Sequence, residues 1–321
     1  MADMHYRPLG RSGLMVSAVG LGCNNFGRPK TATETQAGTD AVVHAAIDAG
    51  ITLFDTADIY GGQRGLSESL MGNALRGRRD EVVLATKFGM DMGGANGPDW
   101  GARASRRYIR IAVEASLRRL RTDWIDLYQL HHPDGITPMD ETLAALDELV
   151  QQGKVRYIGH SNLTGWQIAD AEWRAESAGH PHFISAQNEY SLLVRHVEDD
   201  VLPAANAYGL GFLPFFPLFN GLFTGKYTRE SRPADGRLTV IRPEALDGVP
   251  WDAMARYQAF CDERGVSMLE ATLEWLLAQP GVSSVIAGAT KPEQVVTNAR
   301  SAGRWSPTPT DLAAISAFFP R

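Results

Sequence analysis

Cysteine is scarce in this sequence, with only Cys23 and Cys261 among 321 residues. The two stand far apart and fit no metal-ligand spacing, so they predict free thiols in a reducing compartment and no bound metal. Apolar runs of the roughly 20 residues that cross a bilayer are also missing, as is an N-terminal apolar stretch typical of a signal peptide. We therefore expect a cytoplasmic protein with no membrane partner.

Excess positive charge is missing as well. The formal net charge is -6, whereas nucleic-acid binders are more often basic, so the composition argues against a nucleic-acid partner. Hydrophobic residues make up 44% and charged residues 21% of the chain, which is ordinary for a globular protein and sufficient for a core. The length exceeds the average of about 150 residues per domain, but (β/α)8 barrels commonly reach it as one domain.

Short apolar segments alternate with longer amphipathic segments along most of the chain. The short segments are predicted to be core strands, at Ala18–Gly22, Thr52–Asp55, Val82–Lys87, Ile125–His131, Val155–Ser161, Phe183–Asn188, Gly211–Phe216 and Ser284–Gly288. Strands that alternate with helices predict a parallel sheet with right-handed crossovers. Such a sheet either closes into a barrel or stays open and doubly wound.

Two features favour the barrel. The first predicted strand is not followed by the Gly-x-Gly-x-x-Gly turn of the open dinucleotide-binding fold. Polar residues stand at the C-terminal ends of several strands, which is where a barrel assembles its site. The sequence therefore predicts an α/β fold, a (β/α)8 TIM barrel that spans residues 1–321 as one domain. The segments His5–Leu9 and Leu14–Ala18 are predicted to form a β-hairpin that covers the bottom of the barrel.

The segments between the strands carry helix signals. Leu143, Leu146 and Leu149 share one face of a predicted helix that Gly153 ends. Thr164 and Gln167 have the spacing of a capping box at the start of another helix. The segment 220–248 is weakly periodic, and it is predicted to be a binding loop or a disordered connection.

Four chemically versatile side chains follow the ends of three consecutive predicted strands. Asp55 ends one strand and precedes Tyr60, Lys87 ends the next strand, and His131 ends the third. In a barrel these ends face one mouth. A buried lysine beside Tyr60 would lower the tyrosine pKa from about 10, so that the phenol could serve as a general acid. Asp55 would keep the lysine charged, and the histidine would bind the substrate oxygen.

Each of these residues alone also has an ordinary structural interpretation. Asp55 could cap a helix, Lys87 could extend toward solvent, Tyr60 could pack, and His131 could be a core histidine. At about even odds for each residue alone, all four gathering at three consecutive strand ends is much less probable by chance, so we favour catalysis.

The order of these segments resembles the aldo-keto reductase family over essentially the whole chain. The motifs that carry the resemblance are Gly20–Gly22, Phe54–Gly61, Thr86–Gly89, Ser116–His131, Gly153–Asn162, Gln187–Tyr190, Gly221–Tyr227 and Gly288–Gln294. The resemblance implies the barrel, NADPH as the cofactor and a small carbonyl compound as the substrate. It also implies a catalytic tetrad, which maps onto Asp55, Tyr60, Lys87 and His131.

The resemblance further implies a cofactor site along the later strands. Ser161, Asn162 and Gln187 would hold the nicotinamide carboxamide, and Phe215 would stack on its ring. Many relatives have a serine where this chain has Phe216, so backbone amides would have to replace its hydroxyl near the diphosphate. The other residues predicted for this site are Gly22, Cys23, Pro217, Leu218, Lys226, Gly288, Thr290, Lys291, Gln294 and Asn298.

A helix start is predicted at the end of the last strand. Either Thr290 caps it together with Glu293, or Pro292 takes its first position, and the two registers differ by one residue. The helix N-terminus and Lys291 would bind a ribose 2′-phosphate, with Gln294 nearby. The preference for NADPH over NADH is therefore a hypothesis that the two dissociation constants test. An arginine of the loop is expected to cover the cofactor, and the candidates are Arg229, Arg232 and Arg237.

The substrate pocket is the least defined part of the prediction. The residues expected to line it are Asn24, Phe26, Phe88, Trp100 and His132. The glycine-rich segment 90–105 would shape it, and the aromatic side chains predict a moderately apolar carbonyl substrate.

Two other functions remain open at this point. The chain could be a regulatory subunit that senses the cofactor and turns over slowly. It could also be a lyase or isomerase without nicotinamide, in which Lys87 forms a Schiff base. That second alternative predicts trapping of the substrate by borohydride and no binding of NADPH.

Overall fold

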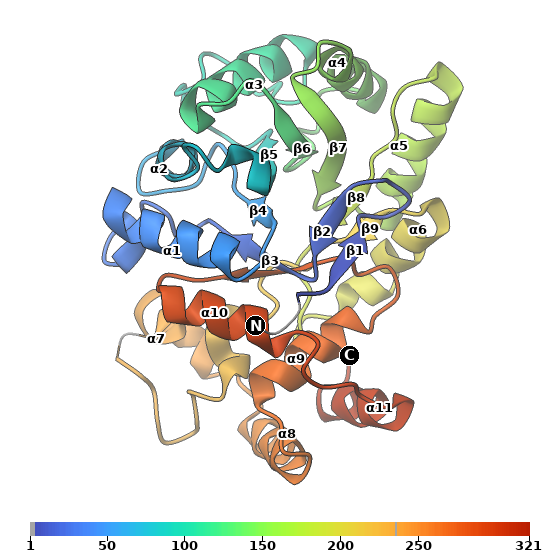
Figure 1. Ribbon diagram of the computed structural model, residues 1–321. Helices are drawn as coiled ribbons and strands as arrows, with labels where there is room; N and C mark the ends of the chain where they lie inside the picture. The colour runs from blue at the N-terminus through green and yellow to red at the C-terminus, as the bar shows by residue number, and fades with distance from the viewer. Residues whose placement is uncertain (1–3, 235) are drawn as a thin grey trace.

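A parallel β-barrel surrounded by helices forms the centre of the molecule (Figure 1). The computed structural model describes residues 4–234 and 236–321. Within these residues the sheet has the order β10-β3-β4-β5-β6-β7-β8-β9. Its strands are β3 (Val19–Gly22), β4 (Leu53–Asp55), β5 (Val83–Phe88), β6 (Ile125–Leu130), β7 (Val155–Ser161), β8 (Ser185–Gln187), β9 (Gly211–Phe212) and β10 (Val285–Gly288).

The barrel closes between the last two strands. The amide of Phe212 donates to the carbonyl of Gly281 at 2.8 Å, and the amide of Ser283 donates back to Phe212 at 3.0 Å. Further along, the amide of Ile286 donates to the carbonyl of Pro214 at 3.0 Å. These bonds join the two edges of the sheet, so the barrel is confirmed and the open doubly wound sheet is excluded.

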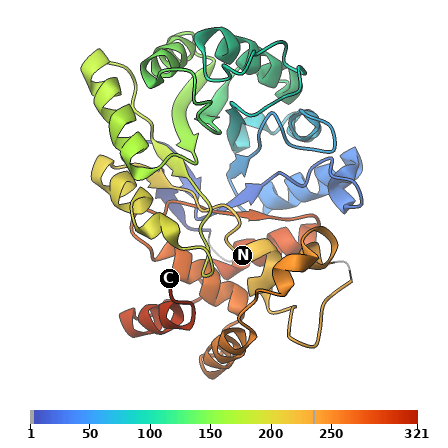
Figure 2. The same cartoon turned by 180° about the vertical axis from the view of Figure 1, so that it is seen from behind.

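Helices cover the outside of the barrel, as Figures 1 and 2 show from opposite ends. The helices that follow successive strands are α1 (Gln36–Asp48), α2 (Leu66–Ala74), α3 (Arg106–Leu120), α4 (Met139–Gln151), α5 (Gly165–Ala178), α6 (Val201–Tyr208), α9 (Met268–Leu277) and α10 (Pro292–Ser301). Three further helices are α7 (Arg237–Ile241), α8 (Trp251–Glu263) and α11 (Pro309–Phe318). No helix in the described part of the chain is long and apolar enough to cross a membrane.

The helix signals in the sequence have direct structural counterparts. On α4, Leu143, Leu146 and Leu149 are all buried, because their spacing places them on the face toward the barrel. At the start of α5 the predicted capping box is present, and the amide of Thr164 donates to the Gln167 side chain at 3.0 Å. This box supplies partners for amides that the first helical turn leaves unpaired.

The hairpin of β1 (Tyr6–Pro8) and β2 (Met15–Ser17) covers the bottom of the barrel, as predicted. Arg7 attaches it to the barrel wall by donating to the carbonyls of Leu277 at 2.7 Å and Val282 at 3.2 Å. Its apolar side chains enter the barrel, where a buried cluster is formed by Leu9, Val16, Leu53, Ala85, Leu127, Leu213 and Ile286. Each buried leucine contributes roughly 1.5–3 kcal/mol, so the plug closes this end and leaves the other end for the site.

The segment 220–248 differs from the prediction, because its described residues are largely structured. It includes a 3-10 turn at Phe219–Thr224, the helix α7 and a second 3-10 turn at Pro243–Leu246. Leu238 is fully buried, and its amide donates to the Tyr227 hydroxyl at 3.1 Å. One residue of this segment, Asp235, lies outside the described residues.

The strand β9, the seventh of the predicted core strands, is also shorter than predicted. The sequence indicated a strand over 211–216, but β9 ends at Phe212. Pro214 lacks an amide hydrogen for a continued ladder, and Phe216 adopts a left-handed backbone with φ of 52°. The regular strand therefore ends early, although single bonds continue the pairing as far as Phe215, whose amide donates to the Asn188 carbonyl at 3.1 Å.

Candidate active site

Four predicted catalytic side chains gather at the end of the barrel opposite the hairpin. Asp55 is the last residue of β4, Lys87 lies near the end of β5, and His131 follows β6 directly. Tyr60 stands in the loop between β4 and α2, and it is half-buried. Because parallel strands end at the same rim, residues 76 positions apart in sequence are brought together.

Lys87 lies at the centre of the cluster and is fully buried. Its ammonium donates to both oxygens of Asp55 at 2.7 Å and to the carbonyl of Thr56 at 2.9 Å. Burial works against its charge, but Asp55 and Tyr60 outweigh burial and raise the pKa of Lys87 above its usual value. The amine is therefore held protonated at neutral pH.

Two glutamines support this ion pair, and sequence reasoning assigned neither of them to it. The side-chain amides of Gln129 and Gln187 donate to Asp55 Oδ1 at 3.2 and 3.0 Å. Gln187 was predicted to hold the nicotinamide carboxamide, but its amide nitrogen is directed to the carboxylate. The signal that could have identified these residues is the register of the barrel, which pairs Gln129 with Lys87 across β5 and β6.

Tyr60 lies against both Lys87 and His131. Its ring centre is 5.2 Å from the Lys87 ammonium and 5.7 Å from the His131 ring, which meets it edge-on at 85°. Burial raises the pKa of Tyr60, and the charge and hydrogen bond of Lys87 only partly offset it, so the net direction is upward. The predicted lowering of this pKa is therefore wrong for the free protein, because the desolvation of the phenol exceeds the attraction of one ammonium.

His131 stays neutral in this position. Burial, then Lys87 and His132, lower the pKa of His131 well below its usual value. Its amide donates to the Phe88 carbonyl at 2.8 Å and its carbonyl accepts from Asn162 at 3.1 Å, so the backbone is held from both sides. A neutral imidazole can offer one N–H donor to an oxygen in the mouth.

Ser161 and Asn162 end β7 at the same rim. The Ser161 hydroxyl donates to the Gln187 carbonyl at 2.7 Å and accepts from the Asn162 side chain at 3.0 Å. Asn162 has a left-handed backbone with φ of 60°, a conformation that asparagine tolerates better than most residues. Both side chains are therefore fixed at the rim by local bonds.

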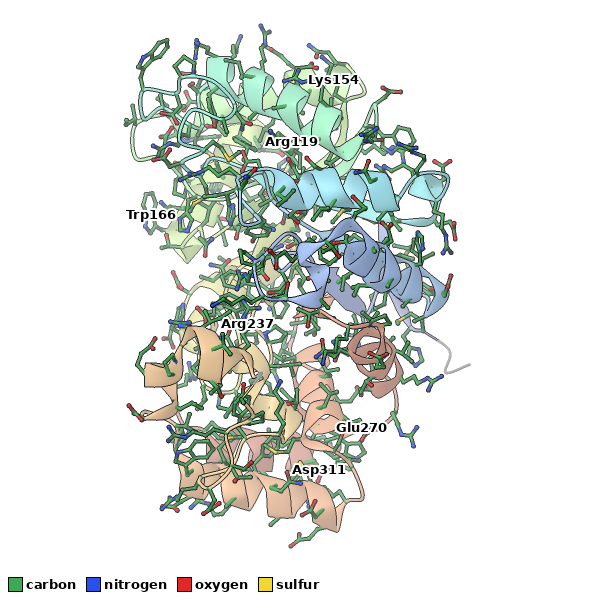
Figure 3. All side chains as sticks on the ribbon, turned by 90° about the vertical axis from the view of Figure 1, so that its left-hand side faces the viewer. Arg119, Lys154, Trp166, Arg237, Glu270 and Asp311 are labelled. Atoms are coloured by element: carbon green, nitrogen blue, oxygen red, sulfur yellow. The ribbon has the colours of Figure 1, made fainter. Side chains whose placement is uncertain are left out.

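An arginine lies above the rim on the far side of the mouth. Arg237 donates to Asn25 Oδ1 at 3.1 Å, and its guanidinium lies 5.4 Å from the centre of the Phe216 ring. Figure 3 shows it where the region of α7 meets the region of α1. Its Nε is buried and has no hydrogen-bond partner among the described residues. Burial, then the charges of Arg28 and Arg242, lower the pKa of Arg237 to about 10.

Arg229, another candidate for covering the cofactor, is bound at the surface. Arg229 pairs with Asp252 at 2.7 Å, and both side chains are exposed. Lys226 lies 5.4 Å from the ring of its neighbour Tyr227. Of the loop cations, Arg237 is thus the one that the contacts place against Phe216 at the barrel mouth.

The turn that holds Phe215 and Phe216 is partly open to solvent. Their rings meet edge-on at 5.3 Å, and both side chains are half-buried. Pro217 and Leu218 behind them are buried. The aromatic rings thus form one wall of the mouth, next to Arg237.

The last helix start resolves the two registers left open by the sequence. Pro292 is the first residue of α10 and Lys291 is its cap, so the capping box of Thr290 with Glu293 is not formed. Gln294 takes over, because its side-chain oxygen accepts from the amide of Thr290 at 2.9 Å. Farther along the helix, Asn298 is buried.

Two glycines make room at the neighbouring strand ends. Gly22 and Gly288 are paired across β3 and β10. A Cβ atom on Gly288 would lie 3.3 Å from the Asn25 amide nitrogen, closer than ordinary van der Waals contact. Cys23 next to them is fully buried, its thiol contacts the Leu21 carbonyl at 3.4 Å, and its amide donates to the Asp55 carbonyl at 2.8 Å. It has no surface left to contact a cofactor, so its assignment to the cofactor site is corrected.

Two residues predicted for the substrate pocket lie in the core instead. Phe26 and Phe88 are fully buried, and Phe88 stacks on Tyr128 with ring centres 4.7 Å apart. Successive side chains of a strand point to opposite faces, so Lys87 faces the barrel interior and Phe88 faces the helices. Neither phenylalanine has surface left to contact a substrate, and both assignments are corrected.

The other pocket candidates lie nearer the surface. Asn24 is half-buried and His132 is exposed, with its ring 6.2 Å from that of His131. Trp100 is 75% exposed, and the Arg107 guanidinium covers one face of its indole at 4.4 Å. These positions leave His132 as the candidate that contacts the catalytic cluster.

An open cavity of about 850 Å³ flanks the loop of Tyr60, and sequence reasoning found only one of its walls. It separates that loop from the glycine-rich segment, and its lining consists of Ile59, Gly61, Gly62, Gln63, Arg64, Met92, Gly93, Gly94 and Ala95. The catalytic side chains do not line it, so it borders the site from outside. The described residues contain no group of three His, Cys, Asp or Glu side chains that could hold a metal ion.

Comparison with known proteins agrees with this arrangement. The model of the Aldo/keto reductase family matches residues 18–318. The uncharacterized oxidoreductase YrpG of Bacillus subtilis (strain 168) is 39% identical, over 91% of this chain and 89% of its own length. A probable voltage-gated potassium channel subunit beta of Oryza sativa subsp. japonica is 36% identical, over 93% and 91%.

An enzyme with a named reaction is also among the relatives. The L-glyceraldehyde 3-phosphate reductase of Escherichia coli (strain K12) is 34% identical, over 98% of this chain and 92% of its own length. The resemblance found in the sequence is confirmed by these matches. The family match and the oxidoreductase relatives support a carbonyl-reducing oxidoreductase. The chain belongs to the aldo/keto reductase family.

Proposed function

We propose that this protein reduces aldehydes or ketones to alcohols with NADPH, and that Tyr60 is the general acid. The observation that carries the proposal is the fully buried Lys87, which is bound by both oxygens of Asp55 and lies against the Tyr60 ring. Lys87 stabilises the phenolate that remains after Tyr60 gives up its proton, so proton transfer to the substrate oxygen becomes easier.

The other residues of the cluster have distinct tasks. Asp55, held by Gln129 and Gln187, keeps Lys87 charged and directed at the phenol. The neutral His131 donates a hydrogen bond to the carbonyl oxygen and orients it toward Tyr60. Because Tyr60 is protonated at neutral pH in the free protein, the acid is ready before the substrate arrives.

The rim residues fit a dinucleotide, which when bound supplies the hydride. Arg237 has a buried Nε that finds no hydrogen-bond partner in the part of the chain that the structure describes, and its pKa is lowered by burial and by two other arginines, so an anion would stabilise it. Gly288 has no Cβ atom that would crowd the Asn25 side chain, and α10 begins at the same rim with Pro292 as its first residue. We assign the diphosphate to Arg237 and the 2′-phosphate to the start of α10.

The Schiff-base alternative is disfavoured by the state of Lys87. A Schiff base needs a neutral amine that can reach a carbonyl. The Lys87 ammonium is instead bound by Asp55 and Thr56, and its pKa is raised by Asp55 and Tyr60 despite burial. The tetrad thus supports reduction.

A regulatory role remains a second candidate, because two plant relatives are named as probable voltage-gated potassium channel subunits beta. Such a subunit would bind NADPH and turn over slowly. The turnover number separates the two functions, since an enzyme is expected to reach about 1–1000 per second with a good substrate.

The decisive experiment follows NADPH oxidation by absorbance with a panel of aldehydes and ketones. We expect Tyr60→Phe to lower kcat by about 100- to 10,000-fold, while the dissociation constant of NADPH stays within about twofold. Tyr128→Phe is the matched control, because the Tyr128 hydroxyl is buried and has no partner in the described part of the chain. Turnover by Tyr60→Phe at the wild-type rate would falsify the assigned acid.

A further inference from the structure

A buried polar network lies directly behind the catalytic cluster. It joins the loop after β4, the helices α2 and α3, the strand β5 and the glycine-rich segment before α3. Its members are Asp58, Glu68, Thr86, Asn96 and Arg119. Asp58 and Glu68 are completely inaccessible to solvent, although Asp58 is only two residues from Tyr60.

Asn96 connects the two halves of this network. Its side-chain amide donates to Asp58 Oδ2 at 3.1 Å, and its side-chain oxygen accepts from Arg119 at 2.9 Å. Arg119 also donates to Glu68 at 2.6 Å, and Glu68 accepts from the Thr86 hydroxyl at 2.6 Å. Figure 3 shows Arg119 where α3 meets α2.

The network reaches both catalytic strands without touching the mouth. The backbone amide of Asp58 donates to the carbonyl of Lys87 at 3.2 Å, and the amide of Tyr60 donates to Ala57 at 3.1 Å. The turn that carries Tyr60 is thus attached to Lys87 by its backbone and to the glycine-rich segment by the Asp58 side chain. Asn96 directly follows Ala95, which lines the cavity beside Tyr60.

Burial and the charges around Asp58 raise the pKa of its carboxyl group. Two buried carboxyl groups, Asp58 and Glu68, share one guanidinium, and Arg119 gives its shortest bond to Glu68. Burial, then Glu68, raise the pKa of Asp58 well above its usual range, and Arg119 with Asn96 only partly offsets this. The phenols of Tyr108 and Tyr128 also face this region and offer no positive charge.

We propose that Asp58 is a positioning residue of the reductase, which fixes the Tyr60 turn against the glycine-rich segment through the side-chain hydrogen bond that it accepts from Asn96. This inference rests on the proposed function of Tyr60. It assigns no contact with the substrate to Asp58. The side chain acts by keeping the Tyr60 hydroxyl within reach of Lys87 and of the substrate oxygen.

Single-turnover reduction tests the inference, because it reports the chemical step apart from product release. Asp58→Ala is expected to lower the single-turnover rate by about 10- to 100-fold, since a displacement of about 1 Å at a catalytic group costs that much. The dissociation constant of NADPH should change by less than about twofold. Asp58→Asn should restore the rate to within about threefold, because its amide oxygen still accepts from Asn96.

Two further variants separate positioning from a general loss of stability. Glu172→Ala is the matched control, because Glu172 is also a buried carboxyl with a raised pKa, one oxygen bound by a histidine at 2.7 Å and the other without a partner among the described residues. It should keep the wild-type rate. Asn96→Ala should lower the rate as Asp58→Ala does, and the double variant should be no slower than either single variant.

Amide hydrogen exchange does not depend on enzymatic activity, so it tests the positioning role of Asp58 separately from the proposed function. Amide hydrogen exchange should become faster in residues 57–62 and 91–97 of Asp58→Ala and Asn96→Ala, but not of Glu172→Ala. If the wild type reduces no carbonyl compound, the proposed function fails and the exchange result alone decides on the positioning. The inference is overturned if exchange in both segments stays at the wild-type rate, if Glu172→Ala is as slow as Asp58→Ala, or if Asp58→Asn brings no recovery.

Discussion

The two sides of the barrel mouth differ in how far the protein satisfies its own charges. On the acid side, formed by Asp55, Tyr60, Lys87 and His131, the ammonium is bound by a carboxylate and a backbone carbonyl. On the arginine side, formed by Arg237 with Phe216, the guanidinium keeps a buried nitrogen without a partner among the described residues. The bonds of the Lys87 ammonium pre-organise the acid side, whereas the unpartnered Arg237 nitrogen predicts that a ligand completes its bonds.

The largest effect on stability and activity is expected from replacing Lys87, the cation on the acid side. Lys87→Met leaves the Asp55 carboxylate buried without its counter-ion, so we expect a loss of about 3–5 kcal/mol in the free energy of unfolding and a loss of detectable reduction. Urea unfolding and kcat measure the two effects. Adding Asp55→Asn to Lys87→Met should recover stability but not activity, and a fully stable single variant would contradict the ion-pair account.

The pH dependence of reduction tests the role of Tyr60 on the acid side. Burial raises the pKa of Tyr60 above 10 in the free protein, and the acid must be protonated to react. We therefore expect kcat/KM to be level through neutral pH and to fall up to tenfold per pH unit above the Tyr60 pKa. A decline that begins near pH 7 would mean that another group limits the rate. The unfolding midpoint at each pH serves as the control.

A smaller effect is expected from the arginine side. Arg237→Ala should raise the dissociation constant of NADPH by about 10- to 100-fold, because a charge-assisted hydrogen bond is worth about 1.5–3 kcal/mol. The same change should hardly lower the stability of the free protein, since it removes a buried cation next to other arginines. Arg229→Ala is the control, because Arg229 is exposed and pairs with Asp252. If Arg237→Ala and Arg229→Ala raise the dissociation constant of NADPH equally, the specific assignment of Arg237 to the cofactor is wrong.

The smallest effect concerns stability behind the acid side. The folded-state pKa of Asp58 is raised, so its contribution is full at acidic pH and is lost as pH rises through that pKa. Asp58→Asn should therefore gain stability relative to the wild type as pH rises above the usual pKa of an aspartate. Asp311→Asn gives the opposite sign, because hydrogen bonds from Thr308 and then Arg264 lower the pKa of Asp311 to about 2. As pH rises from about 2 to 5, the wild type gains stability from the ionised Asp311 and Asp311→Asn does not. The stability of the variant relative to the wild type should therefore fall with rising pH, which urea midpoints measure.

Sequence signals that depend on near neighbours were reliable. The capping box of Thr164 and Gln167 requires residues three apart, and it is formed. The strand-end positions of Asp55, Lys87 and His131 followed from alternation and strand order, and the barrel brings these residues together. Where two local signals competed, as at Thr290 and Pro292, the sequence left both registers open and the backbone chose one.

Signals that depend on facing direction or on burial were not reliable. Phe88 was assigned to the pocket, yet it follows Lys87 directly and the pleat turns it to the other face of β5. The pKa of Tyr60 was expected to fall because a lysine was near, yet the amount of burial decided its direction. Asp58 lies within the motif Phe54–Gly61, but nothing in the sequence indicated its bond to Asn96, which is 38 residues away.

The sequence by itself determined the alternation of strands and helices and the plug of the barrel, and it singled out the four candidate catalytic side chains. These follow from periodicity and residue type, which act over a few positions of the chain. Only the tertiary structure decided which polar atoms find partners, because that depends on distances between segments that the chain brings together in space. Lys87 and Arg237 are both cations at the mouth, and only the fold shows that Asp55 binds Lys87 while Arg237 Nε has no hydrogen-bond partner within residues 4–234 and 236–321.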